Sequence, residues 1–267
     1  MDGVKLKQSL MGEETKVKER VKRKQTVVVI GLVIAASALA VGNISVSGGA
    51  ESPPDTALMT AMIHWLGHDS FRIDGDNMVI YIDPYKITDG PKADLILITH
   101  DHKDHASPED VAKIQRSDTV IVAASAAAEK LSGQIRTVKP GDKLDIKGIS
   151  IEAVPAYNTN KFRSPGVPFH PRESGYVGYI VTVKGTRIYH AGDTDAIPEM
   201  KSIHCDVALL PVSGIYVMTA EEAATAAAMI HAGIVIPMHV GKGIGSLEDA
   251  ERFKALSPVP AIILPME

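Results

Sequence analysis

Cysteine is almost absent from this chain of 267 residues, in which Cys205 is the single example. One cysteine excludes an intramolecular disulfide, and it excludes a cluster of thiolates as a metal site. The G-x-S-x-G pattern that carries the nucleophilic serine of many esterases is also missing. A metal ion bound by this protein would therefore depend on imidazole and carboxylate groups, and the chain has ten histidines.

An overall excess of positive charge is missing too, because the net charge is −4. Residues 1–25 contain eight Lys/Arg and four Asp/Glu, which leaves 20 basic and 28 acidic residues in the remainder. The segment 1–25 is thus +4 and the rest is −8. Because a phosphate backbone attracts basic surfaces, this balance argues against nucleic acid as a partner.

One long apolar run is present, and it lies near the N-terminus. No charged residue occurs between Thr26 and Glu51, and the predicted membrane segment is 26–46. About 20 apolar residues are needed to cross a bilayer. The basic residues just before the run predict that the N-terminus stays in the cytoplasm and that the rest of the chain crosses.

Two interpretations of this run stay open. It is either an uncleaved signal anchor or a signal peptide cleaved after Ala38-Leu39-Ala40. The length of the basic leader favours the anchor, so we expect a membrane-anchored protein with an extracytoplasmic catalytic domain, or a secreted one after cleavage. The predicted parts are a cytoplasmic leader (1–25), the membrane segment (26–46), a linker (47–60) and a folded domain (61–267).

From Met62 onward, short apolar runs alternate with amphipathic stretches, which is typical of a mixed α/β domain. Helix-start signals, in which Ser or Thr is followed three residues later by an acidic residue, occur at Ser107, Thr219 and Ser246. The predicted strands are 63–73, 78–82, 94–99, 119–123, 207–212, 234–240 and 261–264, with further β structure over 135–156 and 177–190. Helices are predicted to begin at 107 and to span 125–131, 219–231 and 246–256. A β-rich first half followed by alternating strands and helices predicts two sheets between helices.

Three of the histidines fall within six residues, in the pattern H-x-H-x-D-H after the buried strand predicted at 94–99. Alternate residues of an extended segment project to one side, so His100 and His102 could hold one ion together. Asp104 and His105 follow the turn and could reach a second ion. Imidazole and carboxylate ligands without thiolate suit zinc, and manganese or iron remain possible.

Two further strand ends carry candidate ligands. Gly192 allows the backbone to approach closely before Asp193, which we predict to bridge the two ions. His239 ends a later apolar strand in the sequence Pro-Met-His and would complete the second site.

The order H-x-H-x-D-H, then G-D-T, then P-M-H resembles the metallo-β-lactamase superfamily. Four stretches resemble its lactonase-like branch, which includes the L-ascorbate-6-phosphate lactonases: 65–68, 81–84, 189–194 and 218–223. The resemblance runs from Met62 to the C-terminus. It implies a four-layer αββα sandwich, here preceded by the N-terminal anchor helix, with the metals at one edge.

This resemblance also implies a histidine near residues 154–157, where the chain has Asn158 instead. We predict that His170 is the third ligand of the first site. The alternatives are Asn158 as the ligand, a water-completed site, or a role for His170 in substrate binding. Asn158, His68 and Arg163 are candidates for substrate binding. Asp83, at a strand end before a proline, could orient a ligand histidine through a hydrogen bond.

The predicted activity is hydrolysis of a small-molecule ester or lactone by a hydroxide that two divalent metal ions activate. Asp104 would orient the nucleophile or accept its proton. The alternatives are a phospholipase D-like phosphodiesterase of the same fold and a metal-binding module without turnover. Redox chemistry at a di-iron site is disfavoured, because that branch has a glutamate in place of His102.

Overall fold

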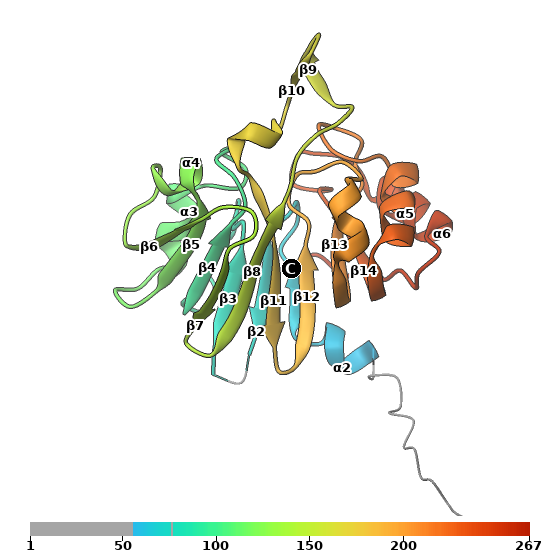
Figure 1. Cartoon of the computed structure of the whole chain (residues 1–267). Helices are drawn as coiled ribbons and strands as arrows, with labels where there is room; N and C mark the ends of the chain where they lie inside the picture. Colours follow the sequence, from blue (N-terminus) through green and yellow to red (C-terminus); the bar gives the residue numbers. More distant parts are fainter. Residues whose placement is uncertain (1–55, 76) are drawn as a thin grey trace, which may run out of the picture. The chain divides into compact units, whose positions relative to one another are not determined.

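The structure, a computed structural model, describes residues 56–75 and 77–267 (Figure 1). The predicted leader and the predicted membrane segment lie outside the described residues. In the part of the chain that the structure describes, no helix combines the length and the apolar character that crossing a bilayer requires.

A short helix precedes the sheets. It is α2 (Thr56–Thr60), which occupies the last five residues of the linker predicted at 47–60. Its Met59 side chain is buried and belongs to the main hydrophobic core. The packed part of the chain therefore includes these five residues.

The first sheet has six strands in the spatial order β1-β2-β3-β4-β5-β6. Their bounds are β1 (Ile63–Trp65), β2 (Phe71–Asp74), β3 (Val79–Ile82), β4 (Leu95–Ile98), β5 (Val120–Ala124) and β6 (Gln134–Val138). The pairs from β1 to β3 are antiparallel and those from β3 to β6 are parallel. All four side chains of β4 are buried, as its continuous apolar sequence predicts for a strand covered on both faces.

The strand predicted at 63–73 is interrupted in its middle. Gly67 (φ 89°) and His68 (φ 57°) both have left-handed backbone conformations, which end the extended run. The prediction that His68 lies within a strand is therefore wrong. His68 instead lies between β1 and β2, where its N–H donates to the carbonyl of Val240 (2.9 Å) and its carbonyl accepts from the N–H of His239 (3.2 Å).

The second sheet also has six strands, in the order β14-β13-β12-β11-β8-β7. Their bounds are β7 (Lys143–Ile146), β8 (Ile149–Pro155), β11 (Val177–Val183), β12 (Thr186–His190), β13 (His204–Pro211) and β14 (His231–Met238). Lys184 (φ 51°) and Gly185 (φ 79°) form the turn between β11 and β12. Positive φ at both positions matches the twist of an antiparallel hairpin, so the turn predicted there is confirmed.

A small hairpin stands apart from both sheets. It consists of β9 (Phe162–Ser164) and β10 (Val167–Pro168), and Figure 1 shows it projecting above the strand ends. Phe162 and Val167 are both exposed there.

Helices cover the outer faces of the two sheets (Figure 1). Their bounds are α3 (Pro108–Ile114) and α4 (Ser125–Ala128) on the first sheet and α5 (Ala220–Met229) and α6 (Leu247–Leu256) on the second, with 3-10 turns η1 (Arg172–Ser174) and η2 (Pro198–Ser202). The larger core lies between the sheets, and a second core lies between the first sheet and its helices. The predicted αββα sandwich is confirmed for the described residues.

The strand predicted at 261–264 does not form. Ala261 makes one isolated bridge to Val235, where the N–H of Ile262 donates to the Val235 carbonyl (3.0 Å). Pro260 and Pro265 flank the segment. Since proline has no N–H to donate, the pairing cannot extend into a ladder, although the apolar side chains still pack against the core.

Candidate metal centre

Side chains from five segments meet at one edge of the sandwich, where strands of both sheets end. The segment after β4 contributes the H-x-H-x-D-H motif, and β12 and β14 lead into Asp193 and His239. Because neighbouring parallel strands end at the same edge of a sheet, their carboxyl ends deliver these residues together. Three groups of possible ligand atoms result. Two of them, one around His100 and one around His105, share no residue, and the third joins His100 and His105 to Asp83.

The first group consists of His100, His102, His170 and Asp193. Nε2 of His100 lies 3.1 Å from Nδ1 of His102 and 3.8 Å from Oδ2 of Asp193. Nε2 of His170 lies 3.3 Å from Nδ1 of His102 and 3.2 Å from Oδ2 of Asp193. Ligand atoms bound tetrahedrally at zinc distances are separated by about 3.3–3.6 Å, so these four groups fit one ion.

Asn158 lies behind His170 rather than in this group. Its Oδ1 accepts from Nδ1 of His170 (2.8 Å) and from the His170 N–H (2.9 Å). Its Nδ2 donates to Asp195 (3.1 Å) and to the Tyr216 carbonyl (3.0 Å). The amide is fully engaged, so of the two candidates for the third ligand it is His170 that faces the other ligand atoms.

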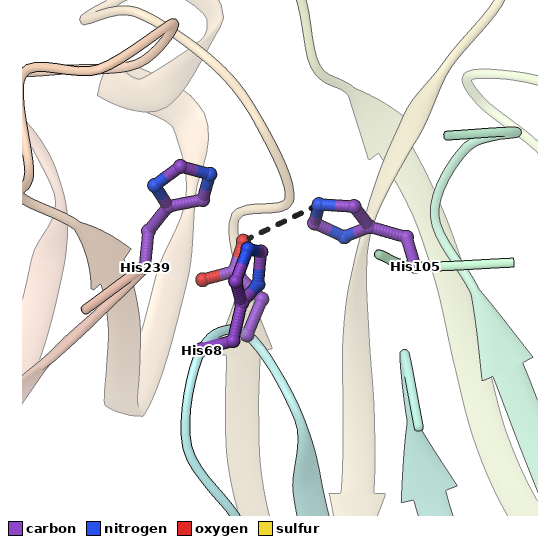
Figure 2. A group of neighbouring side chains, drawn as sticks. His68, His105 and His239 are labelled. Carbon is purple, nitrogen blue, oxygen red and sulfur yellow. Dashed lines mark ion pairs between the residues drawn. The ribbon is translucent and has the colours of Figure 1, made fainter. Parts of the chain in front are cut away.

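The second group consists of His68, Asp69, His105 and His239. Figure 2 shows the three imidazoles projecting from separate segments toward one another. Nε2 of His105 lies 3.4 Å from Oδ1 of Asp193, and Nε2 of His239 lies 3.4 Å from Oδ2 of Asp193. The Asp193 carboxylate therefore contacts both groups, as a bridging ligand would.

Residues outside the two groups fix the orientation of the imidazoles. Asp83 Oδ2 accepts from Nδ1 of His105 (2.8 Å), and the hydroxyl and N–H of Thr99 also donate to Asp83 (2.6 and 2.8 Å). The Ser213 hydroxyl lies 2.8 Å from Nδ1 of His239. The orienting contact predicted for Asp83 is present, and it turns Nε2 of His105 toward Asp193.

Asp104 does not belong to either group of buried ligand atoms. Its Oδ2 lies 3.3 Å from Nε2 of His68, and its side chain is 37% exposed. The sequence predicts Asp104 both as a ligand and as a catalytic group. In the structure it is the most exposed carboxylate of the site and is in contact with His68.

Several buried polar atoms in the centre have no hydrogen-bond partner among the described residues. They are Nδ1 of His68, both oxygens of Asp69, Nε2 of His105 and Oδ1 of Asp193. Leaving such groups unpaired in the interior costs free energy, most of all for a carboxylate. Nitrogen and oxygen donors facing one another without partners are what a pair of divalent cations would satisfy, so the residues present fit the predicted metal ions.

Comparison with known proteins agrees with this geometry. The family model described as "Beta-lactamase superfamily domain" matches residues 62–239. A UPF0173 metal-dependent hydrolase of Methanopyrus kandleri is 32% identical over 209 residues, which cover 72% of this chain and 89% of the relative. A UPF0173 metal-dependent hydrolase of Thermoplasma acidophilum is 34% identical, with 73% and 90% covered.

The chain belongs to the metallo-β-lactamase superfamily.

Within that superfamily it is a metal-dependent hydrolase of the UPF0173 kind. A solved structure of a metal-dependent hydrolase from Parabacteroides distasonis is 38% identical, with a TM-score of 0.68 and coverage of 77% of this chain and 93% of that one. The metallo hydrolase Igni18 of Ignicoccus hospitalis shares the fold at 24% identity, with a TM-score of 0.60 and coverage of 77% and 95%.

The electrostatics of this metallo-β-lactamase site favour metal binding. Burial lowers the pKa of His100 and of His102, and neighbouring imidazoles lower both further, so these rings stay neutral and can bind a cation. Burial disfavours ionisation of Asp193, yet His105 and His239 hold the pKa of that carboxyl well below its usual range. Asp193 is therefore an anion in the middle of the site.

Sequence reasoning overlooked Asp69, which is fully buried in the second group. Burial and the nearby Asp193 raise the pKa of the Asp69 carboxyl well above its usual range. An acidic residue directly after His68, between two segments rich in apolar residues, was the signal that could have identified it.

Of three cationic residues near His170, two form ion pairs with carboxylates. Lys161 is 2.6 Å from Glu222 and Arg172 is 2.8 Å from Glu199, so both are paired with carboxylates. Arg163 is exposed on β9, with its guanidinium 5.7 Å from the ring centre of Phe169. Arg163 is therefore the cation of this region that stays most available to a substrate.

Proposed function

We propose that this protein is a dinuclear metal hydrolase whose substrate is a carboxylic ester or a lactone. The observation that carries the proposal is the Asp193 carboxylate, whose oxygens face the His100 group and the His105 group at the same time. Bound divalent ions would supply a water molecule of near-neutral pKa and an electrophile for the carbonyl oxygen. Zinc suits these ligands, and manganese and iron are the alternatives.

The chain itself supplies the remaining functions. Asn158 and Asp83 hold the His170 and His105 rings in one orientation through hydrogen bonds. Asp104 is partly exposed and ionised: burial opposes ionisation, but the hydrogen bond with His68 lowers its pKa. It is the group best placed to orient a water molecule, and its lowered pKa makes it a weak proton acceptor.

An apolar rim beside His170 supports an ester or lactone over a phosphodiester. Phe169, next to His170, packs on Tyr216 with ring centres 4.5 Å apart. Large exposed apolar side chains on the same two segments are Phe162, Val167, Ile215 and Tyr216. A substrate with an apolar portion could cover this rim while its carbonyl reaches the metal centre. Asn158 meets the rim through its bond to the Tyr216 carbonyl (3.0 Å), and His68 lies in the second ligand group.

A phospholipase D-like phosphodiesterase is the second candidate, and exposed Arg163 is the observation that favours it. Its guanidinium could bind a phosphate oxygen. The lactonase-like resemblance, including its L-ascorbate-6-phosphate members, also makes an anionic lactone a reasonable substrate for the same arginine.

The test uses the full-length chain purified in detergent and loaded with zinc or manganese. We expect two ions per chain by elemental analysis and turnover of p-nitrophenyl acetate or simple lactones. Asp193→Ala should lose the metal and fall to the activity of the chelated enzyme, whereas Asp145→Ala, at an exposed position on β7, should retain both.

Other outcomes would contradict the proposal in distinguishable ways. Turnover confined to bis(p-nitrophenyl) phosphate would select the phosphodiesterase. Two bound ions without turnover of either substrate class would leave a metal-binding module. No bound metal would exclude the dinuclear centre itself.

A further inference from the structure

The carboxylate of Asp69 is the least explained group in the centre. Its side chain is 0% exposed, and neither oxygen has a hydrogen-bond partner among the described residues. A buried, unpaired carboxylate is costly, so it persists in folded proteins where a cation or a hydrogen-bond donor compensates it.

Asp69 lies among three imidazoles that could hold a cation together with it. Its Oδ2 lies 4.0 Å from Nε2 of His105. Its ligand atom and those of His68, His105 and His239 all lie within 4.8 Å of one another. Nε2 of His105 itself has no hydrogen-bond partner among the described residues.

The backbone holds Asp69 in this place. His68, the residue before it, is bonded to the end of β14 through its N–H and its carbonyl. Nε2 of His190 is 2.9 Å from the Asp69 carbonyl, and Nδ1 of the same ring lies 3.2 Å from the N–H of Gly192, next to Asp193. One buried histidine thus links the backbone at Asp69 to the backbone that carries Asp193.

We propose that Asp69 is an additional ligand of the second metal ion, and that its carboxylate shifts this position from Zn²⁺ toward Mn²⁺ or Fe²⁺. The inference rests on the proposed dinuclear centre and adds to it the selectivity of one position. Asp69 joins His105, His239 and Asp193, which gives that ion two imidazoles and two carboxylates. Carboxylates favour the harder ions, and Mn²⁺ tolerates more ligands than tetrahedral zinc does.

The assignment changes the expected role of Asp104. With Asp69 completing the second position from the buried side, Asp104 is left with His68 as its partner at the exposed side. Asp104 then acts on water or substrate, whereas Asp69 acts on the metal.

The experiment compares the wild-type chain with Asp69→Asn, which keeps the size of the side chain and removes its charge. Mn²⁺ binding is followed by loss of the free Mn²⁺ signal in electron paramagnetic resonance, and zinc content by elemental analysis. We expect Mn²⁺ binding at the second position to weaken by at least about tenfold, with one zinc ion retained at the first position. Asp110→Asn, a buried carboxylate bonded to the Lys86 and Ile87 N–H groups, is the matched control and should bind as the wild type does.

Thermal unfolding with and without Mn²⁺ adds a second test. If Asp69 is a metal ligand, Asp69→Asn reduces the rise in Tm that Mn²⁺ produces and leaves the Tm in chelator nearly unchanged. A structural hydrogen-bonding role predicts a lower Tm in chelator and an unchanged rise with Mn²⁺. An unchanged Mn²⁺ affinity in Asp69→Asn would overturn the inference while leaving the dinuclear hydrolase intact, whereas failure of the wild type to bind two ions would remove the proposed function itself.

Discussion

Asn158 and His170 form a unit in which one amide oxygen, Oδ1, accepts from both Nδ1 (2.8 Å) and the backbone N–H (2.9 Å) of the histidine. This bond places the proton of the neutral imidazole on Nδ1 and leaves Nε2 as the lone-pair donor. Nε2 is the atom that faces His102 and Asp193. The asparagine that departs from the family pattern thus prepares the histidine that we propose as the third ligand.

The first prediction concerns this pair. His170→Ala should abolish binding at the first metal position, and Asn158→Ala should weaken it by about 10–100-fold, as loss of an orienting bond does. Asn160→Ala is the control, since the Asn160 amide bonds to Glu222 instead. Competition with a chromophoric chelator measures the affinities, and an Asn158→Ala affinity equal to that of Asn160→Ala would show that the orienting bond has no effect.

The second prediction concerns Asp83 and the second position. Asp83→Asn removes the negative charge opposite Nδ1 of His105, so the ring becomes a weaker and less well oriented donor. We expect affinity at the second position to fall by about 10–100-fold while the first ion stays bound. Asp94→Asn is a matched buried control, because Asp94 bonds to Val79 and Arg116, away from the ligands. Loss of both ions in Asp83→Asn would mean that the residue supports the whole edge and not one ring.

The third prediction is a pH dependence of folding in the metal-free protein. Burial lowers the pKa of His190 below its ordinary value near 6.5, although Asp83 and the hydrogen bond to the Asp69 carbonyl oppose this shift. The unfolded chain therefore takes up a proton first as the pH falls below about 6.5. Stability from this group is present above that pH and decreases as the pH falls, by up to about 1.4 kcal/mol per pH unit.

Burial lowers the pKa of His68 to about 4, which adds to the same trend. His105 acts in the opposite direction, because Asp193 and Asp83 outweigh its burial and raise its pKa. Urea unfolding in chelator between pH 7.5 and 5 should show stability decreasing toward acid, with a shallower slope in His190→Gln. An identical slope in that variant would exclude His190 as a source of the dependence.

The fourth prediction tests the proposed membrane anchor. The full chain should remain in the membrane fraction after a high-salt wash, and deletion of residues 1–46 should release the domain. Protease added outside intact cells or spheroplasts should digest the domain if it is extracytoplasmic. A chain starting after Ala40 in N-terminal sequencing would select the secreted form, and a protease-resistant domain would contradict the predicted orientation.

Local sequence patterns predict much of the secondary structure of this protein. The buried strand β4, the Lys184-Gly185 turn and the Thr219 capping box follow from apolar runs, positive φ and side-chain bonds between near neighbours. These effects act over a few residues, so the sequence alone predicts them. The same holds for the gathering of His100, His102 and His105 after one strand.

Tertiary structure decided what depends on distant segments. Proline on both sides stopped the strand predicted at 261–264, and left-handed backbone at His68 divided the strand predicted at 63–73. Which of Asn158 and His170 faces the ligands depends on the path of the segment between them, which contains the β9–β10 hairpin, and the sequence left both open. The sequence by itself determined the fold class and most of the candidate ligands, because periodicity and motif order carry that information. Only the packing of β1, β12 and β14 at one edge placed Asp69 among them, because burial and the lack of a partner are properties of the whole neighbourhood of a side chain.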